Sequence, residues 1–329
     1  MTRSILLALA LAASGCAMKS GNLPAEEAPT TETETATTST KTTRIADEPR
    51  VCAPSPGPSR REQVCWRWRC DGDASRPATW GGDGATCDAA DLDADAADRA
   101  LRRINVHRAL ADLSPVVLED AWTPAAQECA LIAHANAKLS HTPPEDWACW
   151  SPLGAATSEL SLVANRSAPL SIAAYFEDPG NETTMVHRRW LLDEGLTTVG
   201  LGSTSKFSCV VVDGRALGGP KPAKAAAGRG WAAWPPAGPV PFDVFTEEKL
   251  DTAGWTIQST SDELATADVT VTEDGEPRPI TITRLGAGLG SRSAVRFVPN
   301  GWSTEAGHAY VVTAGAIQLT VEPVDCDVP

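Results

Sequence analysis

The sequence predicts an α+β segment followed by an all-β domain, and two patterns carry this expectation. Between residues 96 and 215, runs with helical spacing alternate with short apolar runs that are typical of buried strands. Beyond residue 239, short runs of alternating polar and apolar residues are separated by turn residues. Such spacing is typical of an antiparallel β-sandwich of the immunoglobulin-like type.

Helix and strand signals in the first segment give approximate element bounds. Acidic residues before residue 96 favour a helix over about 96–113, because the helix dipole stabilises negative charge at its start. Thr123 followed by Pro124 predicts a second helix to about residue 139. A third helix is expected over about 169–177. Residues 198–202 and 207–212 predict a hairpin of buried strands.

The predicted sandwich covers residues 239–329 and follows a linker. Residues 216–238 are rich in Gly, Pro, Ala and Lys, which predicts a linker whose end docks onto the protein. The four clearest strand runs are 267–272, 280–283, 294–298 and 309–313, and a turn signal separates the first two.

The N-terminus predicts export and membrane anchoring. Arg3 precedes an apolar run over residues 5–12 that is too short to span a bilayer, and Ala13-Ser14-Gly15 directly precedes Cys16. This resembles the lipobox of bacterial lipoproteins, which implies a signal peptide over 1–15 and acylation of Cys16 into a lipid bilayer. Ala17, rather than Asp, favours the outer membrane. An ordinary cleaved signal with an incidental Cys is the alternative.

A spacer and a cysteine-rich segment follow the predicted anchor. Residues 16–50 are rich in Thr and nearly devoid of apolar side chains, which predicts a disordered tether. Residues 51–95 hold Cys52, Cys65, Cys70 and Cys87, which predicts a small disulfide-stapled module. Within it, residues 65–70 alternate aromatic and cationic side chains as a strand would. Trp66 and Trp68 either stack on a ligand or cover a core, and we expect the second.

Charge and cysteine usage limit the function classes. The chain has 28 Lys and Arg against 42 Asp and Glu, a net charge of −14, and no segment is basic. Nucleic-acid binding is therefore not expected, because it requires several phosphates to be neutralised. Of nine Cys, eight remain after Cys16, an even number that predicts disulfides in an oxidising compartment. The sequence contains no C-x2-C pair, so a zinc ribbon is not expected.

Five segments in order resemble motifs of one family. They are Asn105–Arg108, Leu113–Leu118, Ala126–Ala130, the S-H-x-P-P…W-x-C stretch over 140–149, and the H-R-R-W-L-L of residues 187–192. Together they are similar to the CAP superfamily of cysteine-rich secretory, antigen 5 and pathogenesis-related proteins, in its bacterial SCP-like extracellular branch. The resemblance covers about a third of the chain. It implies an α-β-α sandwich over 96–215 with a cleft that presents two His and two acidic side chains.

His141 and His187 match the two histidines of that cleft, whereas the acids are altered. Ser158 stands where the family has its first Glu, with Glu159 beside it, and Asp178 stands near the second acidic position. The catalytic candidates implied by the resemblance are therefore His141, His187, Asp178 and Glu159.

Two facing imidazoles would suit a weakly bound Zn²⁺, with Asp178 orienting one ring. The alternative is that His141 and His187 are hydrogen-bonded structural groups. A Ser158–His141 nucleophile pair has no orienting third group in the sequence.

Several other polar residues are expected to be structural. His107, His134 and His308 are interpreted as structural or surface residues, with no partner expected for His107 or His308. Arg188 and Arg189 are expected to pair with Asp193 or Glu194, and Trp190 to pack in the core. Among the cysteines, Cys129–Cys149 is the favoured disulfide and Cys209–Cys326 the second choice.

The function expected from these observations is ligand binding without catalysis. The His-lined cleft of a surface lipoprotein would take a lipid, a peptide or a glycan. The sequence contains neither a G-x-S-x-G nor an H-E-x-x-H motif, the two patterns that would indicate a hydrolase. Two alternatives stay open: a metal-dependent hydrolase acting on envelope peptides, and a structural display protein whose β-sandwich makes the contacts.

Overall fold

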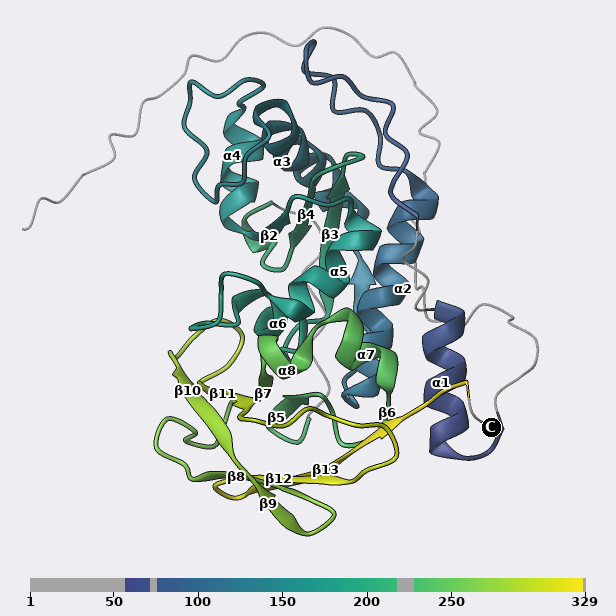
Figure 1. The fold of residues 1–329 in the computed structure, drawn as a ribbon. Helices are drawn as coiled ribbons and strands as arrows, with labels where there is room; N and C mark the ends of the chain where they lie inside the picture. The colour runs from purple at the N-terminus through teal and green to yellow at the C-terminus, as the bar shows by residue number, and fades with distance from the viewer. Residues whose placement is uncertain (1–56, 72–75, 218–227, 328–329) are drawn as a thin grey trace, which may run out of the picture. The chain divides into compact units, whose positions relative to one another are not determined.

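The computed structural model describes residues 57–71, 76–217 and 228–327 (Figure 1). The predicted signal peptide, Cys16, the tether and Cys52 lie outside the described residues. Within the described ranges, no helix has the length and apolar character needed to cross a membrane.

The predicted helices of the first segment are confirmed, with small shifts at their ends. They are α2 (Ala94–Leu110), α3 (Thr123–Asn136) and α5 (Ala168–Glu177), joined by α4 (Pro152–Glu159), α6 (Val186–Leu191) and the short 3-10 helices η1 (Asp120–Trp122) and η2 (Arg215–Leu217). Asp93 caps α2 by accepting hydrogen bonds from the backbone N–H of Asp95 and Ala96. Helix α3 ends where Ala137 takes a left-handed conformation.

A four-stranded sheet lies between two layers of helices. Its order is β1 (Val117–Leu118), β3 (Thr198–Ser203), β4 (Ser208–Val211) and β2 (Ser161–Ala164), with β1 parallel to β3 and the rest antiparallel. Every residue of β2, β3 and β4 is buried, as expected of a sheet covered on both faces. Leu201 and Val210 share a core with α2 and α5, whereas Cys209 packs against α3. This is the expected α-β-α sandwich, and the predicted hairpin is β3–β4.

Glycine lets α3 approach this sheet closely. A Cβ atom on Gly202 would lie 2.0 Å from the carbonyl oxygen of Ala126 in α3, and one on Gly200 would lie 2.8 Å from the Cβ of Trp122. The G-x-G pattern of β3 is therefore a packing feature, because no other residue leaves room for the helix backbone.

The C-terminal part is the expected β-sandwich. One sheet has the order β10 (Ile280–Leu285), β11 (Ser293–Pro299), β7 (Trp255–Ser259) and β5 (Trp231–Trp234). The other has the order β6 (Gly238–Pro241), β13 (Ile317–Val324), β12 (Tyr310–Ala314), β8 (Val269–Glu273) and β9 (Glu276–Arg278). All pairs are antiparallel except β6 with β13. Strand β5 falls inside the predicted linker, and α7 (Phe242–Glu247) and α8 (Leu250–Ala253) follow β6.

The strand predicted over residues 65–70 is wrong, because these residues belong to helix α1 (Arg60–Asp71). Residues three or four positions apart lie on the same face of a helix, so Val64 and Trp68 are buried together. Trp68 packs 5.6 Å from the ring of His107 and lies under the guanidinium of Arg103. The interpretation of Trp68 as a residue that covers a core is therefore confirmed.

Both predicted disulfides are wrong. The described pairs are Cys65–Cys326, Cys87–Cys149 and Cys129–Cys209, and Cys70 is disulfide-bonded as well. Cys129 faces the sheet, where β4 brings Cys209 beside it, whereas Cys149 lies in the loop after α3. Cys65 and Cys87 do not form disulfides within the segment 51–95. Cys65 instead links the segment to the C-terminus, and Cys87 links it to the α-β-α domain.

Candidate functional site

Asp178 and His187 form a buried carboxylate–imidazole pair at the start of α6. Asp178 follows the last residue of α5 in a left-handed conformation and is fully buried. Its carboxylate accepts hydrogen bonds from the backbone N–H of His187 at 3.0 Å and from the imidazole Nδ1 at 2.8 Å. The sequence therefore placed Asp178 correctly beside His187, and the pair leaves Nε2 directed away from the carboxylate.

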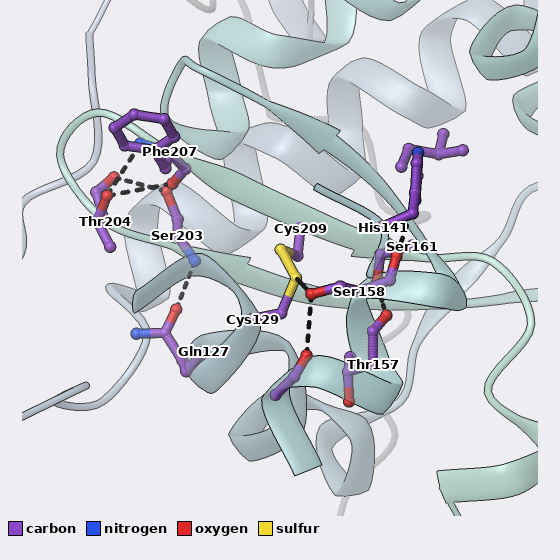
Figure 2. The surroundings of a disulfide bond; sticks show 12 residues. Gln127, Cys129, His141, Thr157, Ser158, Ser161, Ser203, Thr204, Phe207 and Cys209 are labelled. Atoms are coloured by element: carbon purple, nitrogen blue, oxygen red, sulfur yellow. Dashed lines mark hydrogen bonds between the residues drawn. A yellow bond between two sulfur atoms is a disulfide. The ribbon is translucent and has the colours of Figure 1, made fainter. Parts of the chain in front are cut away.

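His141 is held differently, by a backbone carbonyl. It lies in the loop between α3 and α4, where its Nδ1 donates to the carbonyl oxygen of Ser158 at 2.9 Å (Figure 2). The ring is otherwise exposed. The Ser158 hydroxyl donates instead to the carbonyl of Gly154 at 2.9 Å and contacts the sulfur of Cys129 at 3.3 Å. Ser158 and His141 are thus neighbours, but not as a hydroxyl and its base.

A narrow crevice lies under the loop that carries His141. It is too narrow for a water molecule, and its lining is mostly apolar: Cys129, Ile132, Ala133, Ser140, Pro143, Trp147, Ser158 and Val163. The loop is firmly braced. Asn136 exchanges hydrogen bonds with the backbone of Ala148, the Trp150 indole donates to the carbonyl of Pro143, and Cys149 is in a disulfide. A crevice with no room for a water molecule has no room for a methyl group either, so these side chains pack against one another.

The four catalytic candidates do not form one cluster. Glu159 is exposed on α4, while Asp178 is buried beside His187. In the described part of the chain, no hydrogen bond or ring contact joins His141 to His187. Nor do the described residues include a group of three or more His, Cys, Asp or Glu side chains placed to hold a metal ion.

Two motif residues that were expected to pair with acids hold the β-sandwich instead. Arg188 and Arg189 are fully buried, and neither pairs with Asp193 or Glu194. The Arg188 guanidinium donates to the carbonyls of Phe176 and Gly254, the second at 2.6 Å. Arg189 donates to carbonyls of the 286–291 loop. Burial lowers the pKa of Arg188 to about 10, so the guanidinium remains charged at neutral pH.

His107 is structural, as expected, but the expectation that it lacks a partner is wrong. Its Nδ1 lies 2.7 Å from the carbonyl of Arg103, its Nε2 lies 2.7 Å from Oε1 of Glu248, and the ring stacks on Phe176 at 4.0 Å. A signal was available, because His107 lies on the buried stripe of α2 with Ala100 and Ile104, which continues into the C-cap residue Ala111. His308 also has partners, with Nδ1 2.8 Å from Asp274.

The remaining residues behave as expected. His134 is held by the hydroxyl of Thr204 at 2.9 Å and packs against Trp80 with its ring tilted by 49°, a structural role. Burial, with the nearby Lys206, lowers the pKa of His134. Trp190 is partly buried against the main core.

The fold is thus that of a disulfide-stapled α-β-α domain joined to a β-sandwich. Residues 101–211, from within α2 to the end of β4, match the model of the cysteine-rich secretory protein family, CAP. The chain therefore carries a CAP domain. No curated protein and no solved structure matches the chain at a significant level. CAP domains are usually extracellular, and the three described disulfides fit an extracytoplasmic protein.

Proposed function

We propose that this chain is an outer-membrane lipoprotein that binds an envelope ligand at His141 and His187 without converting it. The anchor would be acylated Cys16, and the tether would carry the CAP domain and the β-sandwich away from the lipid surface. The ligand would be a lipid, a peptide or a glycan.

The observation that carries this proposal is the placement of His141. Its ring is exposed and fixed in orientation by the Ser158 carbonyl, and the loop that carries it packs on apolar side chains such as Ile132 and Val163. A fixed polar group beside apolar surface is the usual composition of a binding site, in which the apolar part gives affinity and the polar part orientation. The Ser158 hydroxyl, which would be the nucleophile of a hydrolase, is directed at Gly154 and Cys129 instead.

Binding to a panel of probes would test this proposal. The panel comprises a fluorescent fatty acid, a muramyl peptide and a chitin oligomer, which represent the three ligand classes. We expect one class to bind the full-length chain and to lose at least tenfold in affinity in the His141→Ala/His187→Ala variant, with His308→Ala as the matched control. Equal binding by the double variant would overturn the proposal and would point to the β-sandwich as the contact surface.

One observation favours a hydrolase as the second candidate. A buried carboxylate that holds Nδ1 of a histidine, as Asp178 holds His187, orients Nε2 to act as a general base or as a metal ligand. If this candidate is correct, Zn²⁺ should bind with a stoichiometry of one per chain, and Asp178→Asn should weaken that binding. Calorimetric titration of the full-length chain with Zn²⁺ would measure both.

A further inference from the structure

A separate cavity of about 290 Å³ opens beside the end of α6. It lies between the residues that lead into β3 and those that follow β4, and neither His141 nor His187 lines it. The indoles of Trp122 and Trp190 and the aliphatic side chains of Leu196 and Val212 form its apolar wall. Its volume lies at the lower end of the range for ligand pockets, about 300–1,000 Å³, so it suits a small ligand.

Asp193 contributes a carboxylate that no cationic side chain of the described residues contacts. One oxygen, Oδ1, accepts the backbone N–H of Gly195 at 2.8 Å, and among the described residues the other oxygen accepts no hydrogen bond. The nearest guanidinium, that of Arg108, donates to backbone carbonyls, including that of Asp193 itself at 2.9 Å. Burial raises the pKa of Asp193, as expected for a charge that is only partly solvated.

The other acid of the cavity is already paired. Asp213 receives two hydrogen bonds from the guanidinium of Arg215, at 2.7 and 2.5 Å, in a bidentate ion pair. The cavity therefore contains two carboxylates against one guanidinium and has a net negative charge. Asp193 is the acid of the two that forms no ion pair among the described residues, and the buried Arg108 guanidinium attracts it without contacting its carboxylate.

We propose that this cavity binds a small organic cation, namely a primary ammonium or guanidinium group on a short apolar stem. The indole of Trp190 attracts a cation through its ring quadrupole, and the Asp193 carboxylate supplies a charge-assisted hydrogen bond. The aliphatic wall accommodates the stem. A neutral sugar would stack on Trp190 but would leave the Asp193 carboxylate without an ion pair. The net charge of −14 raises the local concentration of cations around the whole chain.

The test compares charged and neutral probes of equal shape on the full-length chain. We expect n-butylammonium to bind, 1-butanol to bind at least tenfold more weakly, and the affinity for n-butylammonium to fall as salt is raised. The cation could be carried by a lysine side chain of a peptide or by a free amine, and Nα-acetyl-lysine amide distinguishes these two sources. An affinity comparable to that of n-butylammonium indicates a peptide side chain, whereas failure of the amide to bind indicates a free amine. Equal binding of the alcohol and the ammonium, or binding of glucose but of neither cation, would overturn the proposal.

Variants locate the binding in this cavity. Asp193→Asn keeps the acceptor for Gly195 and removes the charge, so n-butylammonium should bind at least tenfold more weakly. Trp190→Leu should weaken it in the same direction. Asp91→Asn, an equal change of charge at an exposed site, should leave it unchanged. An unchanged affinity in Asp193→Asn, with an unfolding midpoint no lower than that of the parent chain, would show that the cation binds elsewhere.

Discussion

His107 and Glu248 lie 2.7 Å apart across the junction between the CAP domain and the β-sandwich, and neither side chain reaches solvent. Because Nδ1 of His107 faces a carbonyl, which only accepts, that nitrogen carries a proton. A second proton must lie between Nε2 and the carboxylate, since two bare acceptors would repel at this distance. The other Glu248 oxygen accepts the indole N–H of Trp234 at 2.6 Å. These hydrogen bonds link His107 of α2, through Glu248, to Trp234 of the sandwich.

This geometry predicts different effects for two substitutions. His107→Ala should lower the free energy of unfolding by about 3–5 kcal/mol, because it leaves a buried carboxylate without its partner. Glu248→Gln should cost less than about 2 kcal/mol, because its amide can donate to Nε2 and accept from Trp234. Urea unfolding of both variants measures the difference. If Glu248→Gln proved the more damaging change, the pair would have to act mainly as a counter-charge for the buried Arg188.

The two parts of the described structure should unfold together. One continuous core contains residues of α2 and α5 and of both sheets of the sandwich, and Arg188 and Arg189 join the two parts through carbonyl hydrogen bonds. We expect a single calorimetric transition for the full-length chain, in which the van't Hoff and calorimetric enthalpies agree. Two separated transitions would mean that the CAP domain and the sandwich are independently stable.

Removing the Cys129–Cys209 disulfide should destabilise the chain more than a surface substitution does. The bond closes a separation of 80 residues between α3 and β4, and both cysteines are buried. The Cys129→Ala/Cys209→Ala variant should lose about 2–5 kcal/mol, mostly because the unfolded chain gains conformational freedom. Peptide mapping without reduction should recover this pair and Cys65–Cys326. Recovery of a Cys129–Cys149 peptide would contradict the structure.

The stability effect of Asp193→Asn should depend on pH. Burial raises the folded-state pKa of Asp193, so the folded chain is favoured when the acid is protonated, and this advantage is lost as pH rises through that pKa. Asp193→Asn should therefore raise the unfolding midpoint at pH 7 and leave it unchanged near pH 3. Differential scanning calorimetry at both pH values measures this. A lower midpoint at pH 7 would mean that the carboxylate stabilises the fold.

Local signals were sufficient for much of the fold. The Thr-Pro start of α3, the acidic start of α2 and the period-two runs of the sandwich each determine an element through nearby residues, and each was placed within a few positions. Helix α1 was mistaken for a strand because alternation over six residues outweighed the helical spacing of its buried side chains.

Features that depend on distant segments could not be read locally. The disulfides join residues brought together only when the sheet forms, so the spacing between Cys129 and Cys149 carried no information about pairing. Arg188 and Arg189 had acidic neighbours in sequence, yet tertiary packing gave their guanidinium groups carbonyls of the sandwich instead. For the site, the sequence identified Asp178 beside His187, but it could not show that His141 is held by a carbonyl rather than by a side chain.

The measurement that tests the central claim most directly is the fate of a bound probe. The panel member that binds the full-length chain would be incubated with it for many hours, and the probe would be quantified by mass spectrometry. Binding without conversion predicts that the probe is recovered intact, and that the bound fraction is lost in the His141→Ala/His187→Ala variant. Product that accumulates beyond one equivalent per chain, and that requires His187, would contradict the account and would establish a hydrolase.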